Sequence, residues 1–159
     1  KMVKGCHHLT GVTGRLERIA PGVYIDYAHT PDGLRVALQA LRPHTKDKLW
    51  VVFGCGGNRD ALKRPMMGEL ADQLADKIIV TDDNPRYEDP VEIRKQILAS
   101  CPNALEATSR HQAIQMAVEG RGPNDIVLIA GKGHETYQIV GDETIPFNDT
   151  EEVQKWVGQ

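Results

Sequence analysis

The sequence predicts an α/β fold in which a mostly parallel β-sheet is flanked by helices. Short apolar runs that are rich in β-branched residues recur along the chain, and a stretch with helical periodicity follows each of them. Strands buried on both faces have this continuous apolar character, whereas strands with one exposed face alternate apolar and polar residues. We therefore expect a sheet that is covered by helices on both sides.

Four apolar runs are the predicted strands of this sheet, and they comprise residues 23–25, 49–53, 78–80 and 126–129. A hairpin is predicted after the last of them, because Gly141 and Asp142 separate two short runs at 136–140 and 143–147. This hairpin is expected to place an antiparallel strand at one edge of the sheet, a position that suits Pro146. The whole pattern is typical of a Rossmann-like domain.

Helix starts are marked by capping residues, two of which precede a proline. The predicted N-caps are Thr30, Asp89, Ser109 and Asp149. Gln112 completes a capping box with Ser109. The apolar stripes expected to face the sheet are Leu34, Leu38 and Leu41; Met67, Leu70 and Leu74; Ile93 and Ile97; Ala113, Ile114, Ala117 and Val118; and Val153 and Trp156. We interpret the Met and Trp positions as core.

Composition indicates one globular domain that binds small molecules. The chain has 159 residues, of which 40% are hydrophobic and 26% charged, and its formal net charge is -3. Disorder would require fewer apolar residues, and a nucleic-acid partner would require an excess of positive charge. No apolar run approaches the roughly 20 residues of a membrane span, and residues 1–8 lack the apolar stretch of a secretory signal. We expect a cytoplasmic protein without a membrane partner.

The three cysteines, Cys6, Cys55 and Cys101, form no CxxC pair, so we expect reduced thiols. His7 and His8 follow Cys6, but three adjacent side chains do not easily converge on one metal ion, and no second cluster completes a tetrahedral set. We therefore predict no metal site there.

Four polar loops follow the predicted strands, at residues 26–32, 54–60, 81–86 and 131–135. In open α/β sheets, ligands bind at the carboxyl ends of the strands, where such loops lie. The glycines of the second and fourth loops match neither GxGxxG nor a Walker A loop, so each loop alone is weak evidence for a phosphate site. Plainer interpretations are a structural role for His29 and helix capping by Asp32 and Asp60.

The third loop carries an arginine on a stiff stem. Asn84 precedes a proline and Pro85 has a fixed φ, so Arg86 projects from a restricted backbone. A guanidinium held in this way suits bidentate binding of a carboxylate, and a structural salt bridge is the alternative. The carboxylates available for such a bridge are Asp82, Asp83 and Glu88. Together with Arg59 and Glu135 on neighbouring loops, Arg86 would enclose a zwitterionic amino-acid head group.

Five motifs are spread over nearly the whole chain. They are GRLE at 14–17, DYAHTPD at 26–32, GCGGNRD at 54–60, DNPR at 83–86 and GKGHE at 131–135. In this order they resemble the carboxy-terminal domain of the Mur ligases. The DNPR motif is similar to the signature of the type that adds meso-diaminopimelate, and differs from the type that adds lysine.

The resemblance implies a role in peptidoglycan precursor synthesis. Ligases of this type join meso-diaminopimelate to a UDP-N-acetylmuramoyl dipeptide, using ATP and Mg²⁺ through an acyl-phosphate. The residues implied to bind meso-diaminopimelate are Arg59, Asp83, Asn84, Pro85, Arg86, Gly131 and Glu135. Arg15 and Asp26 are implied to reach the nucleotide, and His29 to line the same cleft. We expect a structural role for His134, and no catalytic residue or metal ligand in this domain.

The resemblance also implies that residues 15–159 are one domain of a three-domain enzyme, with residues 1–14 as a residual linker. Because the chain has no Walker A loop, the central ATP-binding domain and the N-terminal UDP-binding domain are expected to be absent from it, and the chain alone is expected to be inactive. Alternatives stay open: a lysine-adding ligase domain, a folyl-polyglutamate-type ligase domain, or a free-standing module that senses an amino acid or nucleotide.

Overall fold

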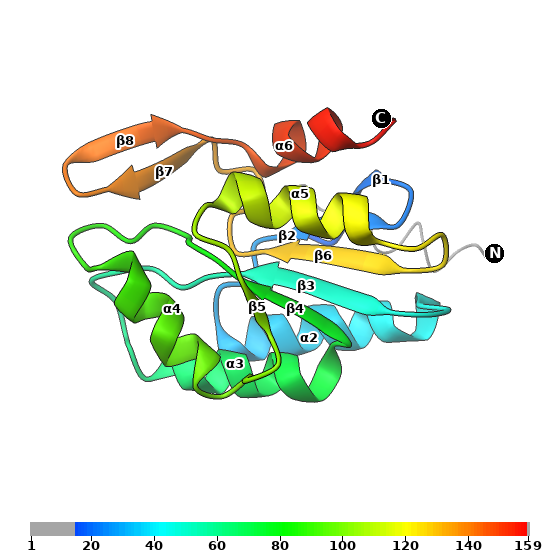
Figure 1. The fold of residues 1–159 in the computed structure, drawn as a ribbon, viewed down its shortest axis with the longest axis horizontal. Coiled ribbons are helices and arrows are strands. Elements are labelled where there is room, and N and C mark those ends of the chain that lie inside the picture. Colours follow the sequence, from blue (N-terminus) through cyan, green and yellow to red (C-terminus); the bar gives the residue numbers. More distant parts are fainter. Residues whose placement is uncertain (1–14, 159) are drawn as a thin grey trace.

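A six-stranded sheet forms the centre of the computed structural model, which describes residues 15–158 (Figure 1). The strand order is β1-β2-β6-β3-β4-β5. The strands are β1 (Glu17–Ala20), β2 (Val23–Asp26), β3 (Leu49–Phe53), β4 (Lys77–Val80), β5 (Leu105–Glu106) and β6 (Ile126–Ala130). All pairs are parallel except β1 with β2. The predicted α/β class is therefore confirmed, and the four predicted strands lie within β2, β3, β4 and β6.

Helices cover both faces of the sheet. They are α2 (Pro31–Leu41), the 3-10 turn η1 (Arg42–His44), α3 (Lys63–Leu74), α4 (Pro90–Leu98), α5 (Arg110–Gly120) and α6 (Asp149–Trp156). Figure 1 shows α2, α3 and α4 on one face and α5 and α6 on the other. None of the helices within residues 15–158 has the length and apolar character needed to span a bilayer.

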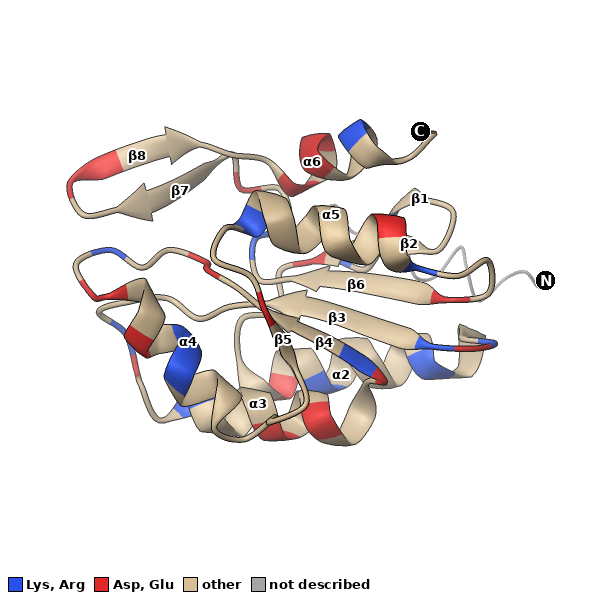
Figure 2. Ribbon diagram, in the orientation of Figure 1, with Lys and Arg blue, Asp and Glu red and all other residues tan. Residues whose placement is uncertain are grey.

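Side-chain alternation along the strands divides the core into two layers. In β3, Leu49, Val51 and Phe53 belong to the cluster that includes the predicted apolar stripes of α2 and α4. Of the predicted stripe of α3, Met67 belongs to this cluster and Leu74 packs against it, but Leu70 is half-buried and lies outside it. Trp50 and Val52 belong to the cluster that includes α5 and α6. Because successive strand residues point to opposite faces, an all-apolar strand supplies both clusters at once. Figure 2 shows β3 and β6 almost without charged residues, which lie mainly on helices and loops.

The predicted hairpin is present, but its predicted position is wrong. Strands β7 (Tyr137–Val140) and β8 (Glu143–Pro146) form a separate two-stranded antiparallel sheet around Gly141 and Asp142. The preceding strand, β6, is central and already pairs with β2 and β3. The hairpin instead joins the loop after β4 through a bridge between Arg86 and Val140. The antiparallel edge strand of the main sheet is β1.

Two short strands were not predicted from the sequence. Strand β1 precedes a turn at Pro21 and Gly22, where Gly22 has a φ of 76°. A Pro-Gly pair is a turn signal that would have identified this connection. Strand β5 has only two residues, Leu105 and Glu106, and two residues are too few to show any periodicity.

Three of the four predicted helix caps are confirmed. The side chains of Thr30, Asp89 and Ser109 accept hydrogen bonds from backbone N–H groups in the first turns of α2, α4 and α5. The predicted cap Asp149 is wrong, because Asn148 caps α6 and accepts from the Glu151 N–H. Asp149 is fully buried, and its carboxylate forms an ion pair with Arg110 inside the protein.

Cys55 and Cys101 are buried and free, as predicted for reduced thiols. Burial raises the pKa of Cys55 to about 12 and that of Cys101 to about 11, so both are protonated and unreactive near neutral pH. The predicted linker at residues 1–14, with Cys6, His7 and His8, lies outside the described residues.

Candidate functional site

The loops that follow β3, β4 and β6 meet at the carboxyl ends of the parallel strands. Figure 1 shows the hairpin projecting at this same end of the sheet. Three close contacts join the first two loops. The Gly57 N–H donates to the Asn84 carbonyl at 2.8 Å. A Cβ placed on Gly57 would lie 1.8 Å from the Pro85 carbonyl oxygen, and one on Gly54 would lie 2.3 Å from the Thr81 carbonyl oxygen. The glycines of GCGG are therefore needed for contact between these loops.

The structure brings Arg59 and Arg86 to the same glycine. A Cβ on Gly56 would lie 2.8 Å from Arg86 Nη1 and 3.6 Å from Arg59 Cγ. Arg59 is exposed and donates to the Asn58 carbonyl at 3.0 Å. The Arg86 guanidinium and the aliphatic stem of Arg59 thus border one small region, and both arginines bring positive charge suited to carboxylates to these loops.

Arg86 is held by the backbone on both sides. Its φ is 54°, in the left-handed region that is uncommon for residues with a side chain. Its N–H donates to the Ile139 carbonyl at 3.0 Å, and its carbonyl accepts from the Gly141 N–H at 2.6 Å. The hairpin therefore also fixes the conformation of Arg86, in addition to the restriction by Asn84 and Pro85 that the sequence predicts.

The alternative of a structural salt bridge at Arg86 is not supported. Within residues 15–158, the Arg86 guanidinium donates only to carbonyl oxygens, those of Gly57 at 3.1 Å and Asn84 at 3.4 Å. The carboxylates considered as partners are paired elsewhere: Asp82 with Arg94, Asp83 with Lys132, and Glu88 with Arg64. The Arg86 side chain is half-buried and retains donors for a ligand.

Lys132 belongs to the loop after β6, and its side chain extends to the loop after β4. Its side chain is 0% exposed, and Nζ donates to Asn84 Oδ1 at 2.8 Å and to the Tyr137 carbonyl at 3.0 Å. Nζ also lies 3.3 Å from Asp83 Oδ1 and 3.7 Å from Glu135 Oε1. A buried ammonium group is stable only when paired in this way.

Glu135 supplies negative charge at the same place. Burial raises the pKa of Glu135, the positive charge of Lys132 opposes that shift, and the nearby Asp83 carboxylate adds to it. A Cβ on Gly131 would lie 2.7 Å from Asp83 Oδ2, so Gly131 allows the loop to pass close to that carboxylate. The seven residues predicted to bind the amino acid therefore lie along one continuous set of contacts.

The residues predicted to reach a nucleotide line a neighbouring cavity of about 480 Å³. Arg15, Asp26 and His29 contribute to it, together with apolar surface from Val36 and Ala37 of α2. Arg15 and His29 are exposed. The cavity adjoins the GKGHE loop, because Gly133 packs so closely on the Tyr27 ring that an added Cβ would lie 2.7 Å from it.

Asp26 has a different role from that of its two neighbours in the cavity. Its Oδ1 accepts from the Leu16 N–H and its Oδ2 from the Ala28 N–H, both at 2.7 Å. Burial raises the pKa of Asp26, while these two hydrogen bonds and the charge of Arg15 oppose the shift. Its carboxylate thus holds the turn that carries Arg15, and both of its oxygens already accept a hydrogen bond from the protein.

His134 contacts a side chain on the edge strand. Its Nε2 lies 2.6 Å from Glu17 Oε1, which links the GKGHE loop to β1. This contact agrees with the structural role expected for His134. No group of three or more His, Cys, Asp or Glu side chains within residues 15–158 is arranged to hold a metal ion.

Sequence analysis missed buried cations at this end of the sheet, among them Lys132 and Arg110. Lys132 lies between two glycines with positive φ, 119° at Gly131 and 54° at Gly133, which is a signal that the chain turns sharply around it. Arg110 is the other, and it donates to the carbonyls of Ala130 and Asp82 at 3.1 Å each. Arg110 opens a capped helix, and nothing in its sequence surroundings distinguishes it from an exposed arginine.

Comparisons with known proteins identify similar chains. Residues 14–133 match the family model described as "Mur ligase, glutamate ligase domain". The UDP-N-acetylmuramoyl-L-alanyl-D-glutamate--2,6-diaminopimelate ligase of Bradyrhizobium diazoefficiens is 56% identical over 151 residues, which cover 92% of this chain and 31% of that protein. The protein of the same name from Zymomonas mobilis is 57% identical over 150 residues, covering 89% of this chain and 31% of its own length.

Solved structures show the same fold. A structure of a UDP-N-acetylmuramoyl-L-alanyl-D-glutamate--2,6-diaminopimelate ligase aligns with a TM-score of 0.77 and 42% identity, over 85% of this chain and 28% of that one. The bifunctional folylpolyglutamate synthase/dihydrofolate synthase of Yersinia pestis aligns with a TM-score of 0.64 over 76% of this chain and 28% of that one; at 16% identity, it shares the fold alone. The chain thus spans about a third of the length of its curated relatives.

Proposed function

Because this chain belongs to the Mur ligase family, we propose that it is the amino-acid-binding domain of an ATP-dependent ligase that adds meso-diaminopimelate to UDP-N-acetylmuramoyl-L-alanyl-D-glutamate. The names of its relatives support this substrate pair. Three relatives that are 51–57% identical to the chain share the same name. The observation that carries the proposal is the Arg86 guanidinium, which is held by backbone hydrogen bonds and has no carboxylate partner among residues 15–158.

The charges around Arg86 match both ends of a diamino diacid. Arg86 supplies a guanidinium group next to Gly56, Arg59 supplies a second one from the same loop as that glycine, and Glu135 supplies a carboxylate on the adjoining loop. A carboxylate of the substrate binds a guanidinium, and an ammonium group binds Glu135. The remaining residues of the proposed site are Asp83, Asn84, Pro85 and Gly131.

The pocket distinguishes meso-diaminopimelate from lysine by one carboxylate. Lysine lacks the second acid group on the far carbon, so an arginine covered by bound lysine would keep its backbone carbonyl acceptors but would have no carboxylate to balance its charge. An unpaired buried charge costs about 3–5 kcal/mol. A difference of this size corresponds to a preference of roughly a hundredfold or more for meso-diaminopimelate.

The neighbouring cavity fits a nucleotide. Arg15 and His29 can meet phosphate oxygens, and the apolar surface of Val36 and Ala37 suits a base or ribose. ATP activates the accepting carboxylate for attack by the amine. We place Mg²⁺ and the phosphate-activating residues in a central domain, and the UDP-linked substrate mainly in an N-terminal domain, both outside this chain. This chain holds and orients the amine donor, and the reaction takes place in the bacterial cytoplasm.

The full-length enzyme provides the test. Phosphate release should require ATP, Mg²⁺, the UDP-linked dipeptide and meso-diaminopimelate together. Arg86→Ala should raise the KM for meso-diaminopimelate by roughly a hundredfold and reduce its advantage over lysine. Arg42→Ala is the matched control, because it removes a guanidinium that pairs with Asp76 beside the start of β3, at the opposite end of the sheet.

Three results would contradict the proposal. An unchanged preference for meso-diaminopimelate over lysine in Arg86→Ala would exclude the recognition role of that side chain. A full-length enzyme that uses lysine or glutamate as well as meso-diaminopimelate would favour one of the related ligase activities. Tight binding of an amino acid by this chain alone, measured by calorimetry, would favour a sensor module.

A further inference from the structure

We propose that Lys132 is a positioning residue for amino-acid recognition, which orients Arg86 and Glu135 without itself contacting the substrate. The inference rests on the proposed function and deepens it, because it adds a residue that decides how well the pocket selects its ligand. Lys132 is fully buried, so its ammonium group is enclosed by protein and acts on the substrate only through its neighbours.

The contacts of Lys132 come from three separate segments. Nζ donates to Asn84 Oδ1 in the loop after β4 and to the carbonyl of Tyr137 at the start of β7. Its ion pairs reach Asp83 in the first of these loops and Glu135 in its own loop. One side chain therefore ties together the DNPR loop, the GKGHE loop and the hairpin.

A chain of hydrogen bonds leads from Lys132 to Arg86. Asn84 Oδ1, which accepts from Lys132, also accepts from the Ile139 N–H at 2.9 Å. The carbonyl of Ile139 in turn accepts from the Arg86 N–H at 3.0 Å, and the Gly141 N–H closes the bridge on the other side of Arg86. Lys132 thus sets the position of β7, and β7 holds Arg86 in its left-handed conformation.

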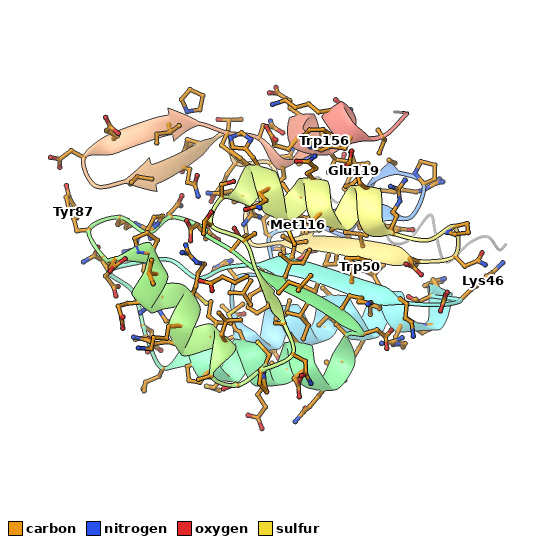
Figure 3. All side chains as sticks on the ribbon, viewed as in Figure 1. Lys46, Trp50, Tyr87, Met116, Glu119 and Trp156 are labelled. Carbon is orange, nitrogen blue, oxygen red and sulfur yellow. The ribbon has the colours of Figure 1, made fainter. Side chains whose placement is uncertain are left out.

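Two further hydrogen bonds attach the hairpin to the loop after β4. Gln138 Nε2 donates to the Asp83 carbonyl at 2.6 Å, and the Tyr87 hydroxyl donates to the Asp142 carboxylate in the hairpin turn. Figure 3 shows Tyr87 at the end of its loop, directed toward that turn. The hairpin is therefore attached along its length to the loop that carries Arg86, and Lys132 is the buried end of this attachment.

Glu135 depends on Lys132 more directly. The ammonium group lies 3.7 Å from its carboxylate and favours the ionised form in a partly buried position that also faces Asp83. An ionised Glu135 is the form that binds a substrate ammonium group. Loss of Lys132 would consequently weaken recognition at both ends of the amino acid.

The test uses the full-length ligase with Lys132→Met and Lys132→Gln. Methionine keeps the length of the side chain and removes its charge, whereas glutamine keeps an N–H donor and so gives a second variant if the first does not fold. We expect the KM for meso-diaminopimelate to rise about 10- to 100-fold, because small displacements of binding groups have effects of this size. The KM values for ATP and the UDP-linked dipeptide should change less than about twofold.

Arg94→Met is the matched control. Arg94 is also a buried cation with two carboxylate partners, Asp82 and Glu106, but it lies on α4 and does not contact the hairpin. This control should lower the melting temperature while preserving the preference for meso-diaminopimelate over lysine. The Lys132 variants should reduce that preference at a comparable loss of thermal stability.

A double-mutant cycle with Arg86→Ala separates positioning from general stability. Lys132→Met should raise the KM less in the Arg86→Ala background than in wild type, and the rise that remains should come from its effect on Glu135. Independent, multiplicative effects would overturn the inference, as would an unchanged KM or equal losses for all three substrates. If wild-type enzyme fails to use meso-diaminopimelate at all, the proposed function fails first, and the inference with it.

Discussion

Removal of the Asp149 carboxylate should strongly destabilise the chain, since it leaves a buried arginine without its counter-ion. The side chains of Arg110 and Asp149 are both 0% exposed, and they form two parallel contacts of 2.8 Å, Nε to Oδ1 and Nη2 to Oδ2. Burial lowers the pKa of Arg110, but the charge and hydrogen bonds of Asp149 outweigh this and raise it. The perturbation to test is Asp149→Leu.

The magnitude follows from the geometry. Two unit charges about 4 Å apart attract by about 4 kcal/mol at the effective dielectric constant near 20 that suits protein sites. Loss of one partner of a buried pair typically costs about 3–5 kcal/mol. Arg110 keeps its hydrogen bonds to the carbonyls of Ala130 and Asp82, which prevents a larger loss. We expect Asp149→Leu to lose about 3–5 kcal/mol, or very roughly 6–20 °C in melting temperature.

Urea unfolding of the 159-residue chain, followed by tryptophan fluorescence and circular dichroism, measures this change. Arg110→Met/Asp149→Leu removes both charges and should be more stable than Asp149→Leu alone, because no unpaired charge remains. Glu151→Gln is the control, because it removes an exposed acidic charge from the first turn of the same helix, α6. It should lower the free energy of unfolding by less than about 1 kcal/mol. A loss below about 1 kcal/mol in Asp149→Leu, or a double variant no more stable than the single one, would refute the reasoning.

Two further predictions concern a buried carboxylate and a loop contact. Asp125 accepts hydrogen bonds from the N–H groups of Trp50, Lys48 and Gly122. Burial raises the pKa of Asp125, but these hydrogen bonds outweigh that effect and hold the pKa below the ordinary value of an aspartate. Asp125→Asn should therefore lower the free energy of unfolding by about 1–3 kcal/mol at neutral pH. In urea unfolding, the difference from wild type should shrink as the pH falls through the depressed pKa of Asp125, because wild type loses the same charge there. A difference in the free energy of unfolding that does not change with pH would contradict this. Gly57→Ala, which places a methyl group against the Pro85 carbonyl, should lower stability by more than about 2 kcal/mol and raise the KM for meso-diaminopimelate. Gly122→Ala, with its nearest contact at 3.5 Å, should change neither property much, and the same result for Gly57→Ala would show that the two loops need not touch.

The proposed site illustrates how an open α/β sheet gathers residues that are distant in sequence. Arg59, Arg86 and Glu135 follow three different strands, yet the parallel order of those strands places all three loops at one end. Close approach of the loops requires glycine where another backbone comes too near for a Cβ. The charged side chains are then held by buried partners such as Lys132, so that they are in place before a ligand arrives.

The amino-acid sequence by itself determined the fold class, the main strands and most helix starts. All-apolar strands, capping residues and apolar stripes act locally, and each keeps its meaning wherever the element lies in the molecule. The motif residues were also recognisable, because five motifs occur in the order of a known family. What they could not reveal is which strands are neighbours, since pairing depends on contacts between segments far apart in the chain.

Only the tertiary structure decided the position of the hairpin and the roles of the buried charges. Strand β6 lies between β2 and β3, so the hairpin that follows it is directed to the DNPR loop instead of the sheet edge. From the sequence alone, the charges of Lys132 and Asp149 predict that both side chains are exposed. They are buried because each meets opposite charge from a distant segment, Asp83 for Lys132 and Arg110 for Asp149, and such long-range compensation leaves no local pattern.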